Sequence, residues 1–322
     1  MSWLVVGGAG YIGSHVVRRL RADRRRVVVL DDLSSGRRER VPYGVPLVVA
    51  SSADRDAVCR ALDRHRVTGV VNLAARKSAP ESVEHPLGYY RENVESMRVL
   101  LEAMVDKGVR RMLFSSSAAV YGRPPSARVD EETPSEPINP YGQTKLICEW
   151  MLRSAGAAHD LSWIALRYFN VVGAADPVCG EKNGANLFPL VFRRVTAGLP
   201  AVVTGQDFPT RDGTGVRDYV HVADVADAHA AAVGRLEAAS CADVYNVGTG
   251  DGYSVLEVLD AVREVTGLPV DVEVLPARPG DPPEVVAEVD KIRRDLGWKA
   301  RNGLVDMVRS TWQAYRRMRP AR

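Results

Sequence analysis

The chain has 322 residues, is 46% hydrophobic and 26% charged, and carries a formal net charge of +3. This composition is typical of a globular enzyme with about two domains, and the small net charge excludes a surface built for a polyanion such as a nucleic acid. The densest basic run, "RADRRR" at 21–26, falls between a helix and a strand and is interpreted as a solvated connection.

No apolar run reaches the ~20 residues that span a bilayer, and the opening "MSWLVVGGAG" is typical of a strand before a glycine turn, not of a signal peptide. The four cysteines, Cys59, Cys148, Cys179 and Cys241, are scattered without metal-ligand spacing. That pattern is typical of reduced thiols in a reducing compartment. The sequence therefore predicts a cytoplasmic protein with no membrane partner and no metal site.

Short apolar runs alternate with helical patterns through the first half of the chain. The runs expected to form buried strands are 3–8, 26–32, 45–51, 69–75, 111–117 and 163–170. The helical patterns between them cover 12–22, 54–65, 87–106 and 140–156. Apolar strands without polar alternation are covered on both faces, so the pattern predicts an α/β fold with a doubly wound parallel sheet of the Rossmann type.

After about residue 170 the chain becomes rich in turn residues and charges. A helical stretch at 224–236, a strand at 243–250 and a helix at 254–266 follow. We expect residues 1–170, with a returning segment at about 218–250, to form the cofactor-binding domain. Residues 171–217 and 251–322 are expected to form a smaller α/β substrate domain at the carboxyl ends of the strands, where ligands bind in such folds.

The segment "GGAGYIG" at 7–13 follows the first strand and opens the first helix. Gly7, Gly10 and Gly13 permit a sharp turn, close approach of a pyrophosphate and close packing of helix on strand, while the helix N-terminus offers free N–H groups. Asp31 and Asp32 end the second strand, where a carboxylate accepts hydrogen bonds from the adenosine ribose and repels a 2′-phosphate. The arrangement predicts a site for NAD in preference to NADP.

The strand "SSSAAVYG" at 115–122 ends where substrates lie, and "NPYGQTK" at 139–145 begins a helix soon after it. Tyr141 and Lys145 are four residues apart and share a helix face. A Lys ammonium, together with a positive nicotinamide ring, favours the phenolate, so the sequence predicts a lowered pKa for Tyr141 and a base for an alcohol. A serine hydroxyl at the strand end would hydrogen-bond the same alcohol oxygen. On spacing alone, the Tyr–Lys pair also fits ordinary packing on a helix surface.

At this point the chain resembles, from end to end, the extended short-chain dehydrogenase/reductase family, and within it the nucleotide-sugar 4-epimerases of the UDP-glucose (UDP-galactose) type. The markers are "GGAGYIGSH", "DDLSSG", "SSSAAVYG", "PYGQTK", "LRYFNVVGA", "DGTGVRDYVHV", "YNVGTG" and "PARPGD". The resemblance implies transient oxidation at sugar C4 with NAD. It makes Tyr141 the base, Lys145 its partner on the nicotinamide ribose, and Ser117 the hydroxyl helper.

The resemblance also implies two sets of binding residues. Around NAD it places Gly7, Gly10, Tyr11, Ile12, Gly13, Asp31, Asp32, Ser35, Gly36, Ser52, Leu73, Ala74, Lys77, Asn93, Ser115, Tyr141, Lys145 and Tyr168. Around a UDP-hexose substrate it places Ser117, Asn170, Asn186, Leu187, Thr204, Arg217, Arg278, Asp281 and Val285. Arginines suit a diphosphate, because the guanidinium fork matches phosphate oxygens.

Several residues depart from the motifs of related enzymes, and two of these departures narrow the choice of reaction and substrate. Ala118 and Ala119 stand where the family's dehydratases and decarboxylases carry an acid/base carboxylate, which favours epimerisation. Val285 stands where strict UDP-glucose/galactose enzymes carry a bulky side chain, which leaves room for the 2-acetamido group of UDP-GlcNAc or UDP-GalNAc. Ser51-Ser52 and Ala75-Arg76 depart from the Gly-Asp and Gly-Leu pairs usual in the family.

Other functions stay open on the sequence alone. A TDP-hexose epimerase or a net dehydrogenase would share the fold and the cofactor. A non-catalytic NAD-sensing protein would share the fold, although such proteins typically lose the Tyr or the Lys. The resemblance further implies a homodimer formed through the helices at 87–106 and 140–156.

Overall fold

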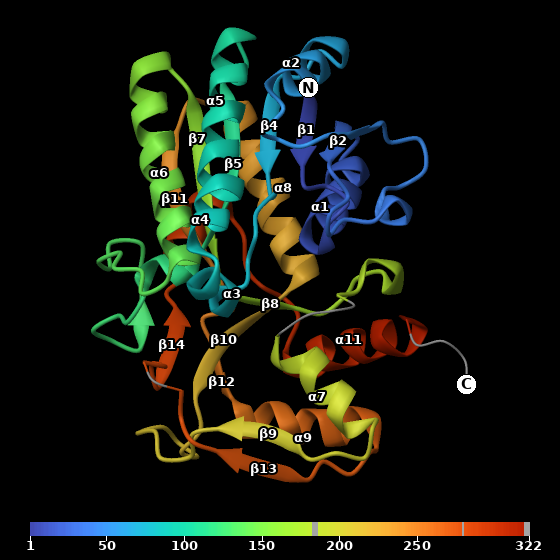
Figure 1. The fold of residues 1–322 in the computed structure, drawn as a ribbon, viewed down its shortest axis with the longest axis vertical. Helices are drawn as coiled ribbons and strands as arrows, with labels where there is room; N and C mark the ends of the chain where they lie inside the picture. The colour runs from blue at the N-terminus through green and yellow to red at the C-terminus, as the bar shows by residue number, and fades with distance from the viewer. Residues whose placement is uncertain (182–185, 279, 319–322) are drawn as a thin grey trace.

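The computed structural model describes residues 1–181, 186–278 and 280–318. A seven-stranded sheet forms its larger part, in the order β11–β7–β5–β4–β1–β2–β3 (Figure 1). Its strands are β1 (Ser2–Val6), β2 (Arg26–Asp31), β3 (Leu47–Val49), β4 (Gly69–Asn72), β5 (Arg111–Ser117), β7 (Ser162–Tyr168) and β11 (Ala242–Val247). Neighbouring strands pair in parallel, and the chain moves outward from β1 in both directions. The predicted doubly wound α/β sheet is therefore confirmed.

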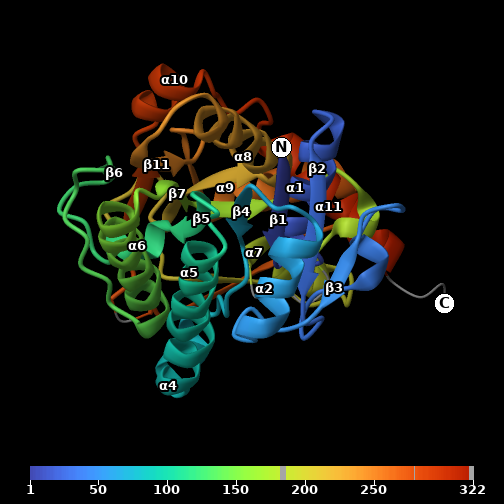
Figure 2. The same ribbon diagram turned by 90° about the horizontal axis from the view of Figure 1, so that it is seen from above.

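Helices cover both faces of this sheet (Figure 2). One face carries α1 (Tyr11–Ala22), α8 (Val222–Ala238) and α10 (Asp290–Leu296), and the other carries α2 (Arg55–Arg64), α5 (Ser96–Asp106) and α6 (Pro140–His159). Alternate residues of β1 enter opposite cores. Trp3 and Val5 pack in the core beneath α1 and α8, whereas Leu4 and Val6 pack beneath α2 and α5. Burial on both faces explains the unbroken apolar runs of the sequence.

The run at 45–51 differs from the prediction. β3 covers only Leu47–Val49, and Val49 is 51% exposed. This strand is the last in the sheet, with β2 as its single neighbour there. The prediction of a buried strand was wrong because strand order, which decides what covers a strand, is not encoded in the strand's own apolar run.

The helix expected at 87–106 is interrupted. It consists of α4 (Pro86–Tyr89), a π-helical turn at Tyr90–Glu95, and α5. The π turn carries Asn93, which is buried and contacts the loop after β4. Single π turns of this kind are frequent at functional sites.

A smaller sheet lies at the carboxyl ends of the parallel strands (Figure 1). It contains β8 (Asn170–Val172), β10 (Val216–His221), β12 (Gly252–Ser254), β14 (Glu284–Ala287) and β6 (Arg128–Val129), and beside it β9 (Ala201–Thr204) pairs with β13 (Val272–Leu275). α7 (Leu187–Val195), α9 (Val255–Thr266) and α11 (Leu304–Met318) enclose a third apolar core around Phe188 and Phe192. Short helical segments are α3 (Ala79–Glu84), Arg38–Arg40, Ala118–Tyr121 and Pro177–Cys179.

The chain passes between the two sheets several times. β7 ends at Tyr168 in the larger sheet, and β8 begins at Asn170 in the smaller one. The expected returning segment at about 218–250 includes the end of β10, which pairs in the smaller sheet, before α8 and β11 reach the larger one. The division into two domains stays a prediction, and its last residues, 319–322, lie outside the described residues. Within the described residues, no helix is long and apolar enough to cross a membrane.

Candidate active site

The glycine segment forms a tight turn between β1 and α1. Gly7 has φ +77, its N–H donates to the Leu30 carbonyl at 2.9 Å, and its own carbonyl accepts from the Gly10 N–H at 3.1 Å. A Cβ atom at Gly13 would overlap the Gly7 carbonyl oxygen. No side chain caps α1 at Gly10, so the first N–H groups of the helix stay available to an anionic ligand. This cradle fits the pyrophosphate of the dinucleotide expected from the sequence.

The two acidic residues after β2 have different positions. Asp31 is 7% exposed, and its carboxylate accepts the N–H groups of Ala9 and Leu33, both at 2.9 Å. Burial raises the pKa of Asp31, and the two N–H donors oppose that shift. Asp32 is exposed and bonds the backbone N–H of Ser34. Asp31 therefore lies at the glycine turn, while Asp32 shapes the loop behind it.

The remaining residues of the predicted NAD set come from loops at the same sheet edge. Ile12 follows the turn in α1; Ser35 and Gly36 follow β2, Ser52 follows β3, and Leu73 and Ala74 follow β4. Gly36 packs directly on Asp31, since a Cβ there would lie 2.9 Å from the Asp31 Cγ. Ser35 is exposed. The loops after parallel strands meet at one edge, so these positions surround a common space.

Asn93 holds the loop after β4 in place through hydrogen bonds, whereas the Lys77 side chain of that loop is exposed. The Asn93 side chain accepts the Arg76 N–H at 2.8 Å and donates to the Arg76 carbonyl at 3.1 Å. It also donates to the Thr144 hydroxyl at 3.0 Å, so its polar atoms hold the loop against α6. Lys77 is exposed, pairs with Glu181 and lies 5.7 Å from the centroid of the Tyr11 ring.

The start of α6 brings Tyr141 and Lys145 to the end of β5. Asn139 caps the helix by accepting the Gly142 N–H at 2.9 Å. The Lys145 ammonium donates to the Ser115 carbonyl at 2.7 Å and lies 5.9 Å from the centroid of the Tyr141 ring. The Ser117 side chain lies beside the Tyr141 phenol, and its effect there favours the phenolate. The structure thus assembles the three residues that the sequence predicted as a catalytic group.

Burial dominates the pKa values of Tyr141 and Lys145 in the protein alone. Burial raises the pKa of Tyr141 above its usual value, and the Ser117 hydrogen bond opposes the shift. Burial also lowers the pKa of Lys145 to about 8. The predicted lowering also relied on a positive nicotinamide ring, so it stays a prediction; in the protein alone, desolvation of the phenol outweighs the effect of its neighbours.

Tyr168 lies beside this group at the end of β7. Its hydroxyl is 2.6 Å from Nε2 of His229, and Nδ1 of that imidazole faces the Val225 carbonyl at 2.8 Å. A carbonyl only accepts, so Nδ1 carries the proton and Tyr168 donates to Nε2. Both side chains are buried, and the histidine partner was not anticipated from the sequence. The feature of the sequence that could have revealed this partner is a histidine within the apolar run of α8.

Three predicted substrate residues lie on adjacent strands of the smaller sheet. In β10, Arg217 is opposite Val285 of β14, and Tyr219 is opposite Asn170 of β8. Burial lowers the pKa of Arg217, and the Asp281 carboxylate opposes that shift. Arg278 is exposed, on the same turn as Asp281, whose N–H donates to the Arg278 carbonyl at 3.2 Å.

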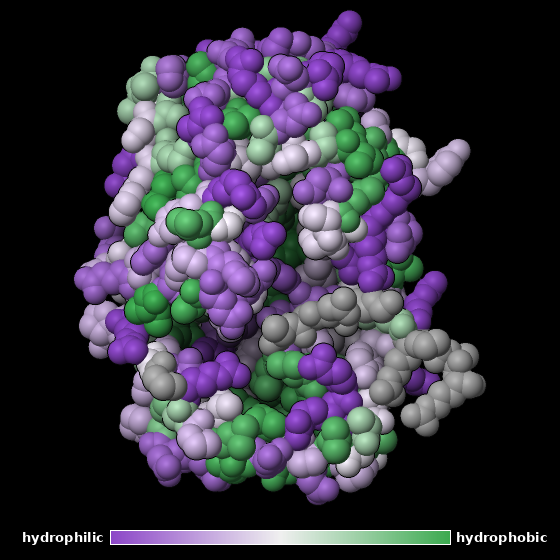
Figure 3. Space-filling model, viewed as in Figure 1, coloured by the Kyte–Doolittle hydropathy of each residue, from purple (hydrophilic) through white to green (hydrophobic). Residues whose placement is uncertain are grey.

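The other predicted substrate residues lie at the ends of neighbouring elements. Asn186 precedes α7 and donates to Glu181 at 2.9 Å, and Leu187 is the first residue of that helix. Thr204 ends β9, opposite Leu275. Figure 3 shows the surface hollowed in the middle of this face, between the part built on the larger sheet and the part below it.

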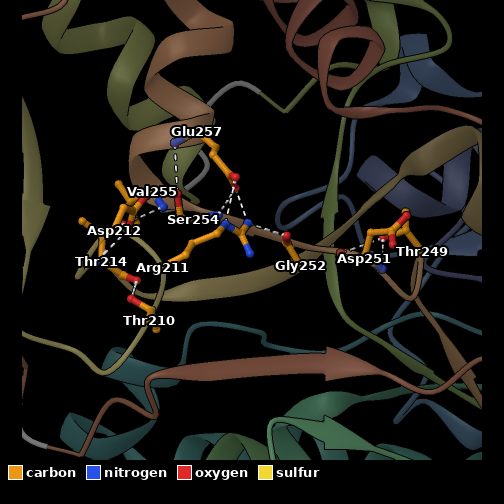
Figure 4. Close-up of polar contacts among 10 residues, drawn as sticks. All are labelled: Thr210, Arg211, Asp212, Thr214, Thr249, Asp251, Gly252, Ser254, Val255 and Glu257. Carbon is orange, nitrogen blue, oxygen red and sulfur yellow. Dashed lines mark hydrogen bonds and ion pairs between the residues drawn. The ribbon is translucent and has the colours of Figure 1, made fainter.

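A polar network holds the loop that leads into Arg217 (Figure 4). The Arg211 guanidinium pairs with Glu257 of α9 and donates to the Gly252 carbonyl at 2.7 Å. Asp212 accepts the Thr214 N–H at 2.9 Å and the Ser254 hydroxyl. The loop is thereby joined to the N-terminus of α9, which fixes where β10 begins.

At the end of β5, Ala118 and Ala119 open the short helix Ala118–Tyr121. A Cβ at Gly142 would lie 2.5 Å from the Ala119 carbonyl oxygen, so α6 begins in close contact with this turn. Because both residues are alanines, the two positions that follow Ser117 offer no side-chain acid or base.

The comparisons with known proteins agree over nearly the whole chain. The model of the NAD dependent epimerase/dehydratase family matches residues 3–248. A UDP-glucose 4-epimerase of Azospirillum brasilense is 44% identical over 321 residues, covering 96% of this chain and 91% of the relative. A crystal structure of UDP-glucose-4-epimerase from Stenotrophomonas maltophila, with bound NAD and formylated UDP-arabinopyranose, is 39% identical with a TM-score of 0.95, covering 99% of this chain and 98% of that one. The UDP-Glc/GlcNAc 4-epimerase of Campylobacter jejuni is 34% identical with a TM-score of 0.87, covering 98% of this chain and 99% of that one.

Proposed function

The chain belongs to the NAD dependent epimerase/dehydratase family, and from that premise we propose that it interconverts UDP-glucose and UDP-galactose by inverting C4 of the sugar. The enzyme is an NAD-dependent isomerase of the nucleotide-sugar epimerase type. The observation that carries the proposal is the meeting of Tyr141, Lys145 and Ser117 at the end of β5, beside a dinucleotide cradle and with alanines at the two positions that follow Ser117.

In this proposal each residue of the group has one task. Ser117 hydrogen-bonds the oxygen at C4, and Tyr141, as its phenolate, takes the proton from that hydroxyl and later returns it. Bound NAD supplies hydride acceptance and return at the same carbon. Lys145, fixed by the Ser115 carbonyl, places a positive charge beside the phenol. Gly7 to Gly13 and Asp31 hold the dinucleotide, while Arg217 and Arg278 face the diphosphate of the sugar nucleotide.

The direct test is incubation of the purified enzyme with UDP-galactose, without added NAD, followed by chromatographic assay of UDP-glucose. Tyr141→Phe should keep the bound NAD, which is measured after heat denaturation, yet lose turnover. An active Tyr141→Phe enzyme would remove Tyr141 from this role. Net release of NADH from a single substrate would indicate a dehydrogenase instead, and a panel of TDP-hexoses tests the choice of base.

We also propose that the sugar pocket admits a 2-acetamido group. Val285 lies opposite Arg217 in the smaller sheet and is only half-buried. A related enzyme of Campylobacter jejuni is described as a UDP-Glc/GlcNAc 4-epimerase, which supports this extension. Val285→Tyr should abolish turnover of UDP-GalNAc while keeping that of UDP-galactose. If the unaltered enzyme turns over UDP-galactose well but UDP-GalNAc not at all, the open-pocket proposal is wrong.

Finally, we propose a homodimer through α5 and α6. Trp150 of α6 is 54% exposed. A surface hollow of about 470 Å³ has the apolar lining residues Leu101, Val105, Met151 and Ala155 of α5 and α6, among charged and polar side chains of the same helices and of α2. Apolar side chains gathered on adjacent helices favour a second copy of the chain as the partner. Light scattering should give twice the monomer mass, and Trp150→Glu should give the monomer mass.

A further inference from the structure

Helix α6 carries a third polar residue in line with Tyr141 and Lys145. Glu149 lies four residues beyond Lys145, so the three share one face of the helix. Glu149 is 3% exposed and Lys145 is also 3% exposed. A charged side chain buried this deeply is costly unless it is paired and hydrogen-bonded, so partners for both residues are expected.

The last three residues of β5 each contact one member of this line. The Ser117 side chain lies beside the Tyr141 phenol, the Ser115 carbonyl accepts from Lys145, and the Ser116 hydroxyl donates to Glu149. Three consecutive strand residues therefore meet three successive turns of the helix. The Ser116–Glu149 contact is the one that does not touch the proposed reacting group.

Glu149 is also held by a guanidinium from β7. Arg167 donates through Nε to Oε1 at 3.0 Å and through Nη2 to Oε2 at 2.7 Å. The two side chains are 6% and 4% exposed, and the guanidinium lies 4.9 Å from the centroid of the Tyr121 ring. A buried ion pair is often no more stabilising than apolar residues of the same size, so stability alone does not account for it.

The charges around Lys145 give Glu149 a second effect. Burial lowers the pKa of Lys145, and the Glu149 carboxylate opposes that shift. Cys148 is beside it on α6, but burial raises the pKa of that thiol to about 12, so it is uncharged when Lys145 titrates. Burial also raises the pKa values of Tyr141 and Tyr168 in the protein alone, before any dinucleotide is bound. Glu149 is thus the anion that acts on Lys145, and Arg167 is the cation paired with Glu149. The Glu131 carbonyl also accepts from Arg167, and the Arg167 charge opposes the raised pKa of the Glu131 carboxyl, so Glu131 is a second anion near that guanidinium.

We propose that Glu149, clamped between Arg167 and Ser116, is a positioning residue for the proposed Tyr141–Lys145 pair. The contacts of Glu149 with Arg167 and Ser116 set the position of α6 along β5. In that position Lys145 reaches the Ser115 carbonyl and Tyr141 reaches Ser117. It also places a paired carboxylate behind the ammonium. The inference rests on the proposed function, because it assigns a role relative to those residues.

Two variants test it through their opposite electrostatic effects. Glu149→Gln removes the anion and leaves Arg167 without its salt-bridge partner, so the basic limb of the pH profile of kcat/KM should move to lower pH by about one unit. Arg167→Met leaves the carboxylate with Lys145 as its cationic neighbour, so the same limb should move to higher pH. Both variants should lower kcat by about tenfold to 100-fold, since small misplacements of reacting groups have effects of that size, while bound NAD is retained.

A matched control separates this from a general loss of stability. Leu152 lies one turn further along α6, is fully buried and is apolar, so Leu152→Ala should destabilise the protein without moving the pH limb. Equal shifts in one direction for both charge variants, or no shift in either, would overturn the inference while leaving the proposed function intact. Loss of the proposed function itself would show instead as an active Tyr141→Phe enzyme.

Discussion

Replacing Gly13 by Ala tests the dinucleotide cradle directly. The added Cβ would overlap the Gly7 carbonyl oxygen and lie 2.8 Å from the Gly8 Cα and 2.9 Å from the Gly7 carbonyl carbon. All three are backbone atoms, so no side-chain rotation relieves the contact. The turn itself is fixed, because Gly7 donates to Leu30 and packs against Ala74. Helix α1 must therefore move away from β1.

The expected size of the effect follows from this geometry. Forcing an extra methyl into a packed site costs about 1–3 kcal/mol, and the better helix propensity of Ala returns about 0.5–1 kcal/mol. The net loss of unfolding free energy is then about 0–2.5 kcal/mol. Moving the first turn of α1 also displaces the N–H groups expected to face the pyrophosphate, so the affinity for NAD should fall by at least about tenfold, or about 1.4 kcal/mol.

Urea unfolding monitored by circular dichroism and titration of the apoprotein with NAD measure the two effects separately. Gly88→Ala is the matched control, because Gly88 lies in α4 and a Cβ there has nothing within 4 Å. That variant should be unchanged or up to about 1 kcal/mol more stable, with unaltered NAD affinity. A Gly13→Ala protein that binds NAD and unfolds like the wild type would refute the reasoning.

Three further predictions concern other parts of the molecule. Burial lowers the pKa of Lys145 from 10.5 to about 8, so between these pH values the unfolded chain binds more protons than the folded protein. The unfolding free energy of the wild type, measured in urea titrations relative to Lys145→Met, should therefore rise with pH across that window. A difference that stays flat or falls would contradict the assignment. Arg217→Leu should raise the KM for UDP-galactose at least about tenfold while leaving the bound NAD unchanged, and an unaltered KM would exclude a diphosphate contact. Leu62→Ala, at a site 1% exposed in α2 and remote from β10, should cost about 2–5 kcal/mol of unfolding free energy without changing KM.

Much of the fold and part of the candidate site could be predicted from local sequence. The turn at Gly7–Gly13 is a backbone requirement of adjacent residues, and the four-residue spacing of Tyr141 and Lys145 is a property of any helix. The apolar runs of β1 and β5 reveal burial on both faces, so the doubly wound sheet was predictable as well. Such features depend on residues that are close in the chain.

The remaining features depend on which distant segments pack together. The exposure of β3 follows from strand order, and the π turn at Asn93 accompanies contacts with Arg76 and α6. The burial that raises the pKa of Tyr141 in the protein alone is a property of the assembled site and not of a spacing, so the sequence did not reveal it.

The sequence by itself determined that a glycine turn precedes a helix, that an acidic residue ends the second strand, and that a tyrosine and a lysine share one face of another helix. Only the tertiary structure decided that Glu149 of helix α6 meets Arg167, 18 residues away in strand β7, and that Ser116 completes their contact. Local patterns constrain dihedral angles and periodicity, whereas the pairing of buried charges depends on how helices and strands are stacked, and a single stretch of sequence contains no record of that stacking.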